Sequence, residues 1–158
     1  MKLFTARLVL VRGDPEVSAF ETWIQDPEVV RYSELRHGVG KPIVEGDNRP
    51  SERWTVYLGD EEIGRLGVTF DKPNNTADLS ILMGEKKYWG DGYGTEAWSA
   101  VMDHLLKSQR KVTAGTMAVN IGMLKIFKKS GMDWDGVRQW QFLWEGKEVD
   151  CVLACKFA

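Results

Sequence analysis

The sequence predicts one mixed α/β domain built around a central sheet that is mostly antiparallel. Seven segments have the alternating or continuously apolar pattern of strands, and four segments carry helix-start signals or helical periodicity. No linker rich in glycine, proline or serine divides the chain. At 158 residues the chain is long enough to bury a substantial core. We therefore expect residues 1–158 to form a single domain.

The strand predictions depend on short apolar or alternating runs bounded by turn residues. The predicted strands are 6–12, 53–58, 63–70, 77–84, 112–119, 137–144 and 149–157. Short turns join the second strand to the third, the third to the fourth, and the sixth to the seventh. These pairs are expected to be antiparallel hairpins.

Four helices are expected. Asp-Pro-Glu occurs at 14–16 and again at 26–28, where it offers an N-cap aspartate, a proline at the first helical position and an early acid. Two short helices are therefore expected at 15–25 and 27–36. Between residues 94 and 108 the apolar side chains form one helical stripe. A fourth, short helix is expected to begin after Asn120 and to end at Gly131. Residues 37–52 show no periodicity and are expected to form a long loop.

Composition excludes several classes of function. The net charge of −2 does not support binding to nucleic acid through bulk electrostatics. No apolar run reaches membrane-spanning length, and the start of the chain lacks the apolar core of a signal peptide, so a cytoplasmic location is expected. Cys151 and Cys155 are expected on one strand, about 13 Å apart, which is too far for a disulfide or a shared metal ion. With only His37 and His104 besides, no metal site is expected.

The stretch GEKKYWGDGYGTEA (84–97) is the most informative part of the sequence. Gly90, Gly92 and Gly94 separate a strand from an amphipathic helix, so the backbone can turn tightly and present free amides to an anion. A P-loop would need a lysine followed by serine or threonine, and a dinucleotide fingerprint would need a third glycine where Thr95 stands. Both of these phosphate-binding motifs therefore fit poorly.

WGDGYGTEA resembles the acyl-CoA pyrophosphate loop of the GNAT acetyltransferases. RLVLVR (7–12), DPEVVRYSE (26–34), ADLSILMGE (77–85) and Asn120 with KIFKKSGM (125–132) resemble other landmarks of that family, in the same order. The most similar branch contains ribosomal-protein N-terminal and amino-sugar acetyltransferases. The resemblance implies a sheet whose fourth and fifth strands splay apart, with the pantetheine arm of acetyl-CoA in the gap.

The resemblance also implies which residues bind acetyl-CoA as a co-substrate, without a metal ion. Trp89 stands where the family loop usually begins with glutamine or arginine. The expected contacts are main-chain groups of Leu82, Met83 and Gly84, the loop residues Trp89, Gly90, Asp91, Gly92, Tyr93, Gly94 and Thr95, and the side chains of Asn120 and Phe127.

Acyl transfer to an amine needs a neutral amine, a stabilised oxyanion and a route for the departing thiolate. The resemblance makes the backbone N–H of Leu82 the expected oxyanion donor. Asp78 is the candidate base, either through a water molecule or by orienting the amine, and a role as a solvated polar residue is the alternative. Glu85 is expected to lie next to the cofactor loop. Phe127 stands where many relatives have a tyrosine that protonates coenzyme A, and it has no proton to donate.

The substrate is expected opposite coenzyme A, near Glu34, Arg36, His37 and Trp140, although a solvated helix end and a core or dimer face are simpler accounts of these residues. The resemblance implies an acetyl-CoA-dependent N-acetyltransferase that works by direct attack of a primary amine. The amine belongs either to a protein N-terminus or to a small molecule such as an amino sugar. A non-catalytic acyl-CoA-binding protein is the alternative. The expected partners are the thioester and the amine, with no nucleic acid or membrane, and the chain is a monomer or a homodimer.

Overall fold

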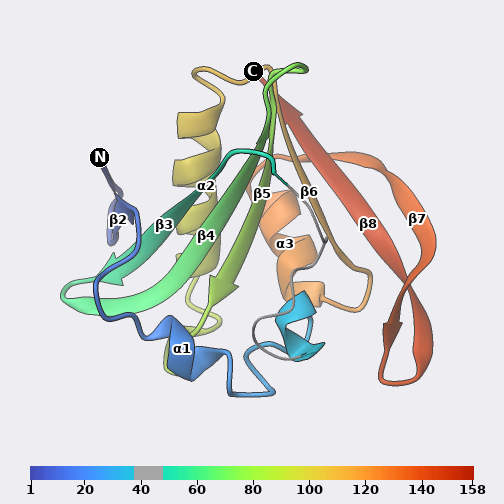
Figure 1. Cartoon of the computed structure of the whole chain (residues 1–158), viewed down its shortest axis with the longest axis horizontal. Helices are drawn as coiled ribbons and strands as arrows, with labels where there is room; N and C mark the ends of the chain where they lie inside the picture. The colour runs from blue at the N-terminus through green and yellow to red at the C-terminus, as the bar shows by residue number, and fades with distance from the viewer. Residues whose placement is uncertain (38–47) are drawn as a thin grey trace.

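A computed structural model describes residues 1–37 and 48–158, and its centre is one eight-stranded sheet (Figure 1). The strands are β1 (Lys2–Phe4), β2 (Val9–Arg12), β3 (Ser51–Leu58), β4 (Glu61–Asp71), β5 (Thr76–Met83), β6 (Lys111–Met117), β7 (Asp133–Trp144) and β8 (Lys147–Phe157). Their order is β1-β2-β3-β4-β5-β6-β8-β7, and only β5 and β6 pair in parallel. The predicted mixed, mostly antiparallel sheet is confirmed, with one strand more than expected.

The additional strand is β1, which forms a tight hairpin with β2. The Thr5 N–H donates to the carbonyl of Leu8 across the turn, and Leu3 pairs with Leu10. Three residues are too few to show a period of two in the sequence, and for this reason the strand was not predicted.

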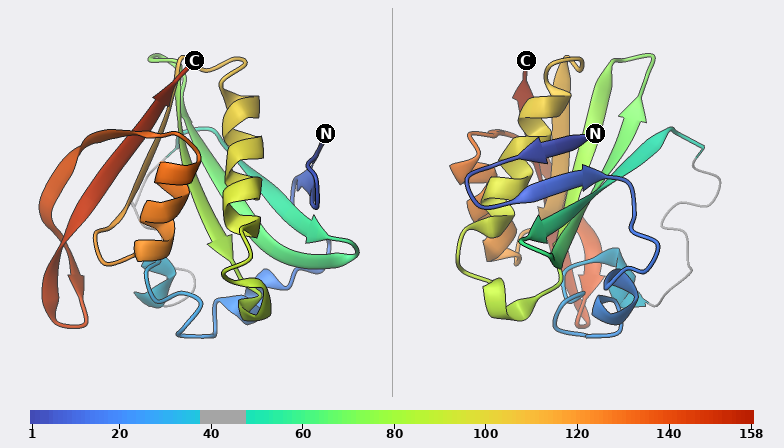
Figure 2. Two further views of the ribbon diagram at one scale, coloured as in Figure 1. Left: turned by 180° about the vertical axis from the view of Figure 1, so that it is seen from behind. Right: turned by 90° about the vertical axis from the view of Figure 1, so that its left-hand side faces the viewer.

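Two α-helices cover one face of the sheet: α2 (Tyr93–Leu105) and α3 (Ile121–Lys129), seen in front of the strands in the left view of Figure 2. Both were predicted, α2 within one residue of its start. The core lies between these helices and the sheet, where large side chains such as Trp54, Trp98 and Leu66 are fully buried. Asn120 caps α3, as expected, because its side-chain oxygen accepts the N–H of Met123 at 3.2 Å.

The two N-terminal helices were wrong in extent. Only α1 (Phe20–Trp23) and the 3-10 turn η1 (Glu34–His37) form among the described residues before β3. Asp14 does not cap a helix, because its carboxylate pairs with Arg53 at 2.9 Å and with Arg65 at 3.1 Å. Asp26 accepts the N–H of Glu28 as a cap would, yet the chain continues as turns. Ion pairs with β3 and β4 thus occupy the carboxylate expected to cap the helix predicted at 15–25, of which only Phe20–Trp23 is α-helical.

The sheet opens between β5 and β6. Within the described residues, this parallel ladder covers only Thr76–Asp78 on β5 and Lys111–Thr113 on β6. Beyond it β5 continues along β4 to Met83, while β6 continues along β8 to Met117, and the two strands diverge in Figure 1. The predicted splay between strands 77–84 and 112–119 is therefore present.

Candidate functional site

The register of β5 determines which backbone groups face the opening. The Gly84 N–H donates to the carbonyl of Ile63 at 2.9 Å, so even-numbered residues of β5 face β4 and odd-numbered residues face β6. Leu82, the expected oxyanion donor, consequently has its N–H directed toward Arg65 of β4. Ile81 and Met83 direct their N–H and carbonyl groups into the opening. The Met83 carbonyl accepts the indole N–H of Trp89 at 2.9 Å.

The glycine-rich loop ends in the N-terminus of α2. A 3-10 turn, η2 (Lys86–Tyr88), follows β5, and Gly90 and Gly92 then adopt φ of +85° and +83°. A residue with a β-carbon rarely adopts this region, which explains why glycine is required at Gly92, the N-cap of α2. The first amides of α2 have no partner within the helix and carry the positive end of its dipole. An anion is favoured at this position.

Arg7, from the β1–β2 turn, braces this loop. Its guanidinium donates to the carbonyl of Asp91 at 3.0 Å and to Glu96 at 2.8 Å, and lies 4.1 Å from the centre of the Tyr93 ring. Glu96 also accepts the hydroxyl of Thr5 and the backbone N–H of Arg7. Burial alone would raise the pKa of Glu96, but the hydrogen bonds from Thr5 and Arg7 lower it. Sequence reasoning did not identify Arg7, which lies 84 residues before Asp91.

The start of α2, the helix α3 and the end of β5 meet at Gly94. A β-carbon there would lie 3.2 Å from Ile126 Cδ1 on α3 and 3.6 Å from Met83 Cγ on β5. One turn further along α2, the ring of Trp98 packs 5.8 Å from that of Phe127. Phe127, at the expected tyrosine position, is buried with 5% of its surface exposed. Asn120, the other predicted side-chain contact, donates to the hydroxyl of Thr116 at 3.1 Å.

Asp78 lies where β5 and β6 separate. Its carboxylate accepts the hydroxyl of Thr113 at 2.8 Å. The side chain reaches solvent, but the surrounding protein removes enough water to raise the pKa of Asp78. The hydrogen bond from Thr113 and the positive charges of Arg49 and Arg138 act in the other direction and lower it, with a smaller effect. Burial likewise raises the pKa of Cys151 on the same face of the sheet. Asp78 therefore holds a proton more readily than an ordinary aspartate, which suits a group that takes a proton from an amine.

Comparisons with known proteins agree with this geometry. The family model described as "Acetyltransferase (GNAT) domain" matches residues 5–133. The chain belongs to the GNAT acetyltransferase family. No curated protein matches the sequence significantly.

Three solved structures illustrate the shared GNAT fold. A ribosomal-protein α-N-acetyltransferase in complex with coenzyme A matches with a TM-score of 0.81 and 12% identity, over 99% of this chain and 98% of that chain. Spermidine N-acetyltransferase from Vibrio cholerae, with coenzyme A and spermine, gives 0.79 and 14%, over 97% and 96%. A microcin self-immunity acetyltransferase, with acetyl-CoA and AMP, gives 0.78 and 14%, over 98% and 94%. At this identity the likeness establishes the fold alone.

On the other face of this GNAT sheet, Trp23 closes over the end of β5. A β-carbon on Gly84 would lie 1.9 Å from Trp23 Cδ2, so only glycine permits this contact. The indole N–H of Trp23 donates to Glu85 at 2.9 Å. Glu85 thus follows the strand and lies beside the loop, as predicted, and its carboxylate holds Trp23. The same segment is fixed by Lys86, which pairs with Asp26 and Glu28.

The predicted substrate residues lie in two places. Glu34, Arg36 and His37 form η1, where Glu34 is 3.7 Å from each of the other two. Arg36 donates to the carbonyl of Leu143 at 3.2 Å, which joins η1 to β7. Trp140 is 62% exposed, with a φ of +51°, in an irregular part of β7 where its N–H donates to Asp150 at 2.8 Å. The loop predicted at 37–52 falls largely outside the described residues.

Sequence reasoning missed the aromatic contact that completes this side. Trp144 stacks on Tyr32 with ring centroids 5.6 Å apart and donates its indole N–H to the carbonyl of Arg31 at 2.9 Å. The sequence signal was the group of aromatic residues in the second segment, Trp140, Phe142 and Trp144, because the first segment contributes Tyr32 alone. This contact holds the β7–β8 hairpin against the segment before η1. The two groups of predicted substrate residues, one on η1 and one on β7, therefore lie on segments that contact each other, and we call this part of the molecule the acceptor side.

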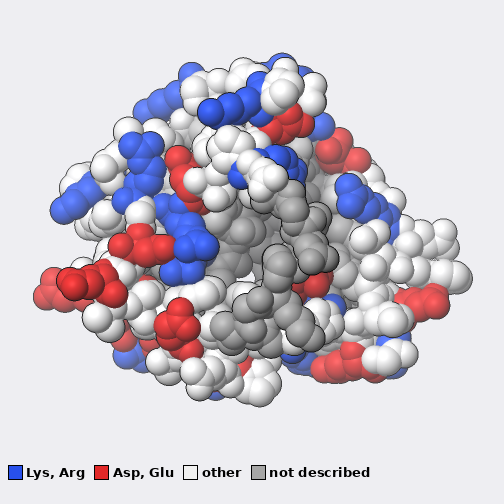
Figure 3. Space-filling view, viewed as in Figure 1, with Lys and Arg blue, Asp and Glu red and all other residues white. Residues whose placement is uncertain are grey.

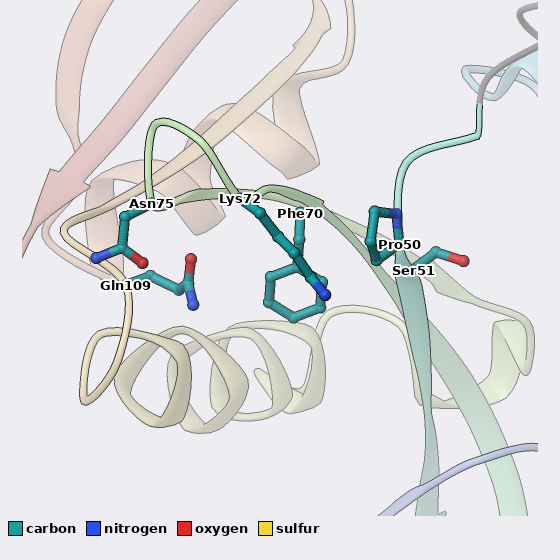
Figure 4. Close-up of a pocket in the computed structure, with 6 residues that line it drawn as sticks. All are labelled: Pro50, Ser51, Phe70, Lys72, Asn75 and Gln109. Carbon is teal, nitrogen blue, oxygen red and sulfur yellow. The ribbon is translucent and has the colours of Figure 1, made fainter.

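A shallow cavity of about 370 Å³ lies elsewhere, at the β4–β5 turn (Figure 4). It is lined by Pro50, Ser51, Phe70, Lys72, Asn75 and Gln109. It lies at the opposite end of β5 from the glycine-rich loop and contains none of the candidate residues. Acidic and basic side chains are interspersed over the face shown in Figure 3. No helix among the described residues is long and apolar enough to cross a membrane.

Proposed function

We propose that this chain is an acetyl-CoA-dependent N-acetyltransferase that moves an acetyl group to a primary amine by direct attack. The observation that carries the proposal is the divergence of β5 from β6 beside the N-terminus of α2. It places a strand edge, which no strand among the described residues pairs beyond Asp78, beside an anion-binding helix end. Pantetheine has amide groups that suit a strand edge, and the pyrophosphate suits the helix end.

The residues present fit acetyl-CoA. The amides at the start of α2, from Tyr93 to Thr95, are the proposed pyrophosphate donors, with Gly90, Asp91 and Gly92 forming the turn before them and Trp89 held on Met83. The groups of Ile81 and Met83 that face the opening are proposed to bind pantetheine, while Leu82 and Gly84 hold the strand to β4. When bound, acetyl-CoA supplies an activated acetyl group and a thiolate leaving group.

The chain's own groups then have separate tasks. We propose that a backbone N–H of Ile81 or Met83, and not that of Leu82, donates to the oxygen that gains negative charge. Asp78 accepts the proton of the amine directly or through a water molecule. Its raised pKa brings it nearer to the operating pH, which favours a base. No cysteine lies in the loop or on β5, so an acyl-enzyme step is not part of the proposal.

The amine is proposed to enter between η1 and the β7–β8 hairpin, near Glu34, Arg36, His37 and Trp140. An α-amino group has a pKa near 8 and a lysine amine near 10.4, so the first is neutral far more often and requires less of a base. A protein N-terminus and a small amine such as an amino sugar both meet this condition. The interspersed charges around η1 match neither class better. Cytoplasmic location and a monomeric or homodimeric state complete the proposal.

A non-catalytic acyl-CoA-binding protein is the second candidate, because Phe127 has no hydroxyl to assist the thiolate. The test is a panel of N-terminal peptides, polyamines and amino sugars, with released coenzyme A measured by a thiol reagent and acetyl-CoA affinity by calorimetry. Turnover above background hydrolysis with any amine supports the enzyme. Acetyl-CoA binding without turnover across the panel supports the second candidate, and absence of binding contradicts both.

A further inference from the structure

Arg138, on β7, carries a charge that the rest of the described protein leaves unpaired. Its side chain is exposed and forms no hydrogen bond, ion pair or ring contact with the residues that the structure describes. Most other arginines have a carboxylate or a backbone carbonyl as partner, namely Arg7, Arg12, Arg31, Arg36, Arg53, Arg65 and Arg110. A charge on an edge strand often does no more than discourage strand pairing, so the surroundings of Arg138 decide its function.

The strand register places Arg138 on the same face of the sheet as the proposed base. Arg138 pairs with Cys151 of β8, and the ladders across β8 and β6 carry this face to Asp78 on β5. The neighbours of Asp78 along its strand, Ala77 and Leu79, point the other way, into the core that includes the buried side of α2. Arg138 and Asp78 therefore share the face turned away from the helices, and β7 belongs to the acceptor side.

The guanidinium of Arg138 reaches back from β7 toward the sheet opening. Three inter-strand steps separate β7 from β5, about 14 Å at the usual strand spacing. Burial raises the pKa of Asp78, and the positive charge of Arg138 is one of the influences that oppose this rise. The same charge opposes the rise that burial causes in the pKa of Cys151. Because charges are largely screened beyond about 10 Å at moderate ionic strength, the side chain must extend over the sheet toward Asp78.

We propose that Arg138 binds an anionic group of the acceptor, so that the substrate is a primary amine that also carries a carboxylate or a phosphate. The inference rests on the proposed function and names the chemical class of its amine. With the amine at Asp78, the unpaired guanidinium on the same face supplies the complementary charge for the anion. Arginine forms two parallel hydrogen bonds with either anion, which fixes the orientation of the substrate. A polyamine has no anion to offer and is disfavoured.

The test compares acceptor amines in pairs that differ by one anionic group. Glucosamine 6-phosphate is paired with glucosamine, and a peptide that begins with serine and aspartate is paired with one that begins with serine and asparagine. In the wild type, kcat/KM for the anionic member of at least one pair is expected to be about tenfold higher, the equivalent of one hydrogen bond to a charged group. A preference in the sugar pair identifies a phosphate, and a preference in the peptide pair identifies a carboxylate.

Arg138→Gln keeps a polar side chain and removes the charge. The preference should then fall to about twofold or less through a higher KM for the anionic amine, while kcat stays within about twofold of the wild type. Arg138→Lys keeps the charge but loses the paired donors, and should retain a preference of about threefold. Arg12→Gln, on β2, is the matched control and should keep the full preference.

Two results overturn the inference while leaving the proposed function intact. The first is equal kcat/KM for the two members of both pairs in the wild type, or turnover of polyamines alone. The second is a preference for the anionic amine that survives unchanged in Arg138→Gln. Absence of turnover with every amine contradicts the proposed function, and the inference then falls with it.

Discussion

The two sides of the sheet opening differ in how they are built. The coenzyme A side consists of backbone: a strand edge, two glycines with positive φ and the first turn of α2. The acceptor side consists of side chains from distant segments, such as Trp144 on Tyr32 and Arg36 on Leu143. The first is determined by residues adjacent in sequence, and the second by contacts that form only when the chain has folded.

This difference explains what the sequence could predict. Glycine spacing and the apolar stripe placed the start of α2 within one residue and its end within three, and the resemblance to the GNAT family implied the splay. The helix predicted at 15–25 is reduced to Phe20–Trp23, because Asp14 is used by Arg53 and Arg65, partners that no local pattern reveals. The helix predicted at 27–36 does not form although Asp26 accepts the N–H of Glu28. The glycine-rich turn and the start of α2 are thus encoded locally, whereas a site made of side chains requires the tertiary structure.

The largest expected effect on acetyl-CoA affinity comes from a substitution in the backbone side alone. In Gly92→Val the N-cap of α2 cannot keep its φ of +83° without strain, so the amides turn away from the anion. We expect acetyl-CoA affinity to fall at least about 100-fold by calorimetry, which corresponds to the loss of two or three hydrogen bonds to a charged group.

Gly59→Val is the matched control for this substitution. Gly59, in the β3–β4 turn, has a φ of +59° and so shares the positive φ of Gly92. A β-carbon on Gly59 would meet open space. The control carries similar backbone strain far from the loop and should bind acetyl-CoA as the wild type does. Equal losses in the two variants would show that the loop is not the binding site.

Asp78→Asn tests the residue at the junction of the two sides. Asparagine can still accept the Thr113 hydroxyl but cannot take a proton, so kcat should fall about 10² to 10⁴-fold with little change in acetyl-CoA affinity. In the wild type kcat/KM should rise with pH through the raised pKa of Asp78. This rise of kcat/KM with pH should be absent in Asp78→Asn when the same amine is used.

Asp78→Asn is expected to lower kcat but not to lower the stability of the fold. Because folding raises the pKa of Asp78, the native state binds the proton more tightly than the unfolded chain. The free energy of unfolding therefore decreases as the pH rises from about 4 to the raised pKa, and stays lower above it. Asp78→Asn removes this loss, so its melting temperature at pH 7 should equal or exceed that of the wild type. A lower melting temperature would indicate a structural role for the carboxylate.

A smaller effect on acetyl-CoA affinity is expected from substitution of Arg7, which supports the glycine-rich loop. Arg7→Met keeps much of the side-chain length and removes the donors to Asp91 and Glu96, so the carbonyl of Asp91 is free to turn toward the anion. Acetyl-CoA affinity should fall about 5- to 20-fold, the equivalent of one hydrogen bond to a charged group. Arg12→Met, which removes a 3.8 Å pair with Glu52 on β3, is the control. A similar loss in both variants would indicate a general effect of surface charge.

The residues expected to act in catalysis could be predicted from the sequence only in part. Asp78 could be named from its strand position, but its raised pKa depends on protein brought around it by the fold. Leu82 was one residue out of phase, because only the hydrogen bond from Gly84 to Ile63 determines which edge of β5 each N–H faces.

The smallest expected effect belongs to the acceptor side. Trp144→Leu keeps an apolar side chain and removes both the stack on Tyr32 and the hydrogen bond to Arg31, which together hold the β7–β8 hairpin in place. The KM for the amine should rise about 3- to 10-fold, while acetyl-CoA affinity stays within twofold of the wild type. Trp134→Leu, at an exposed position near the start of β7, is the control and should change neither quantity. A loss of acetyl-CoA affinity in Trp144→Leu would mean that the acceptor side and the coenzyme A side are coupled. The hairpin includes β8, which pairs with β6 at the sheet opening.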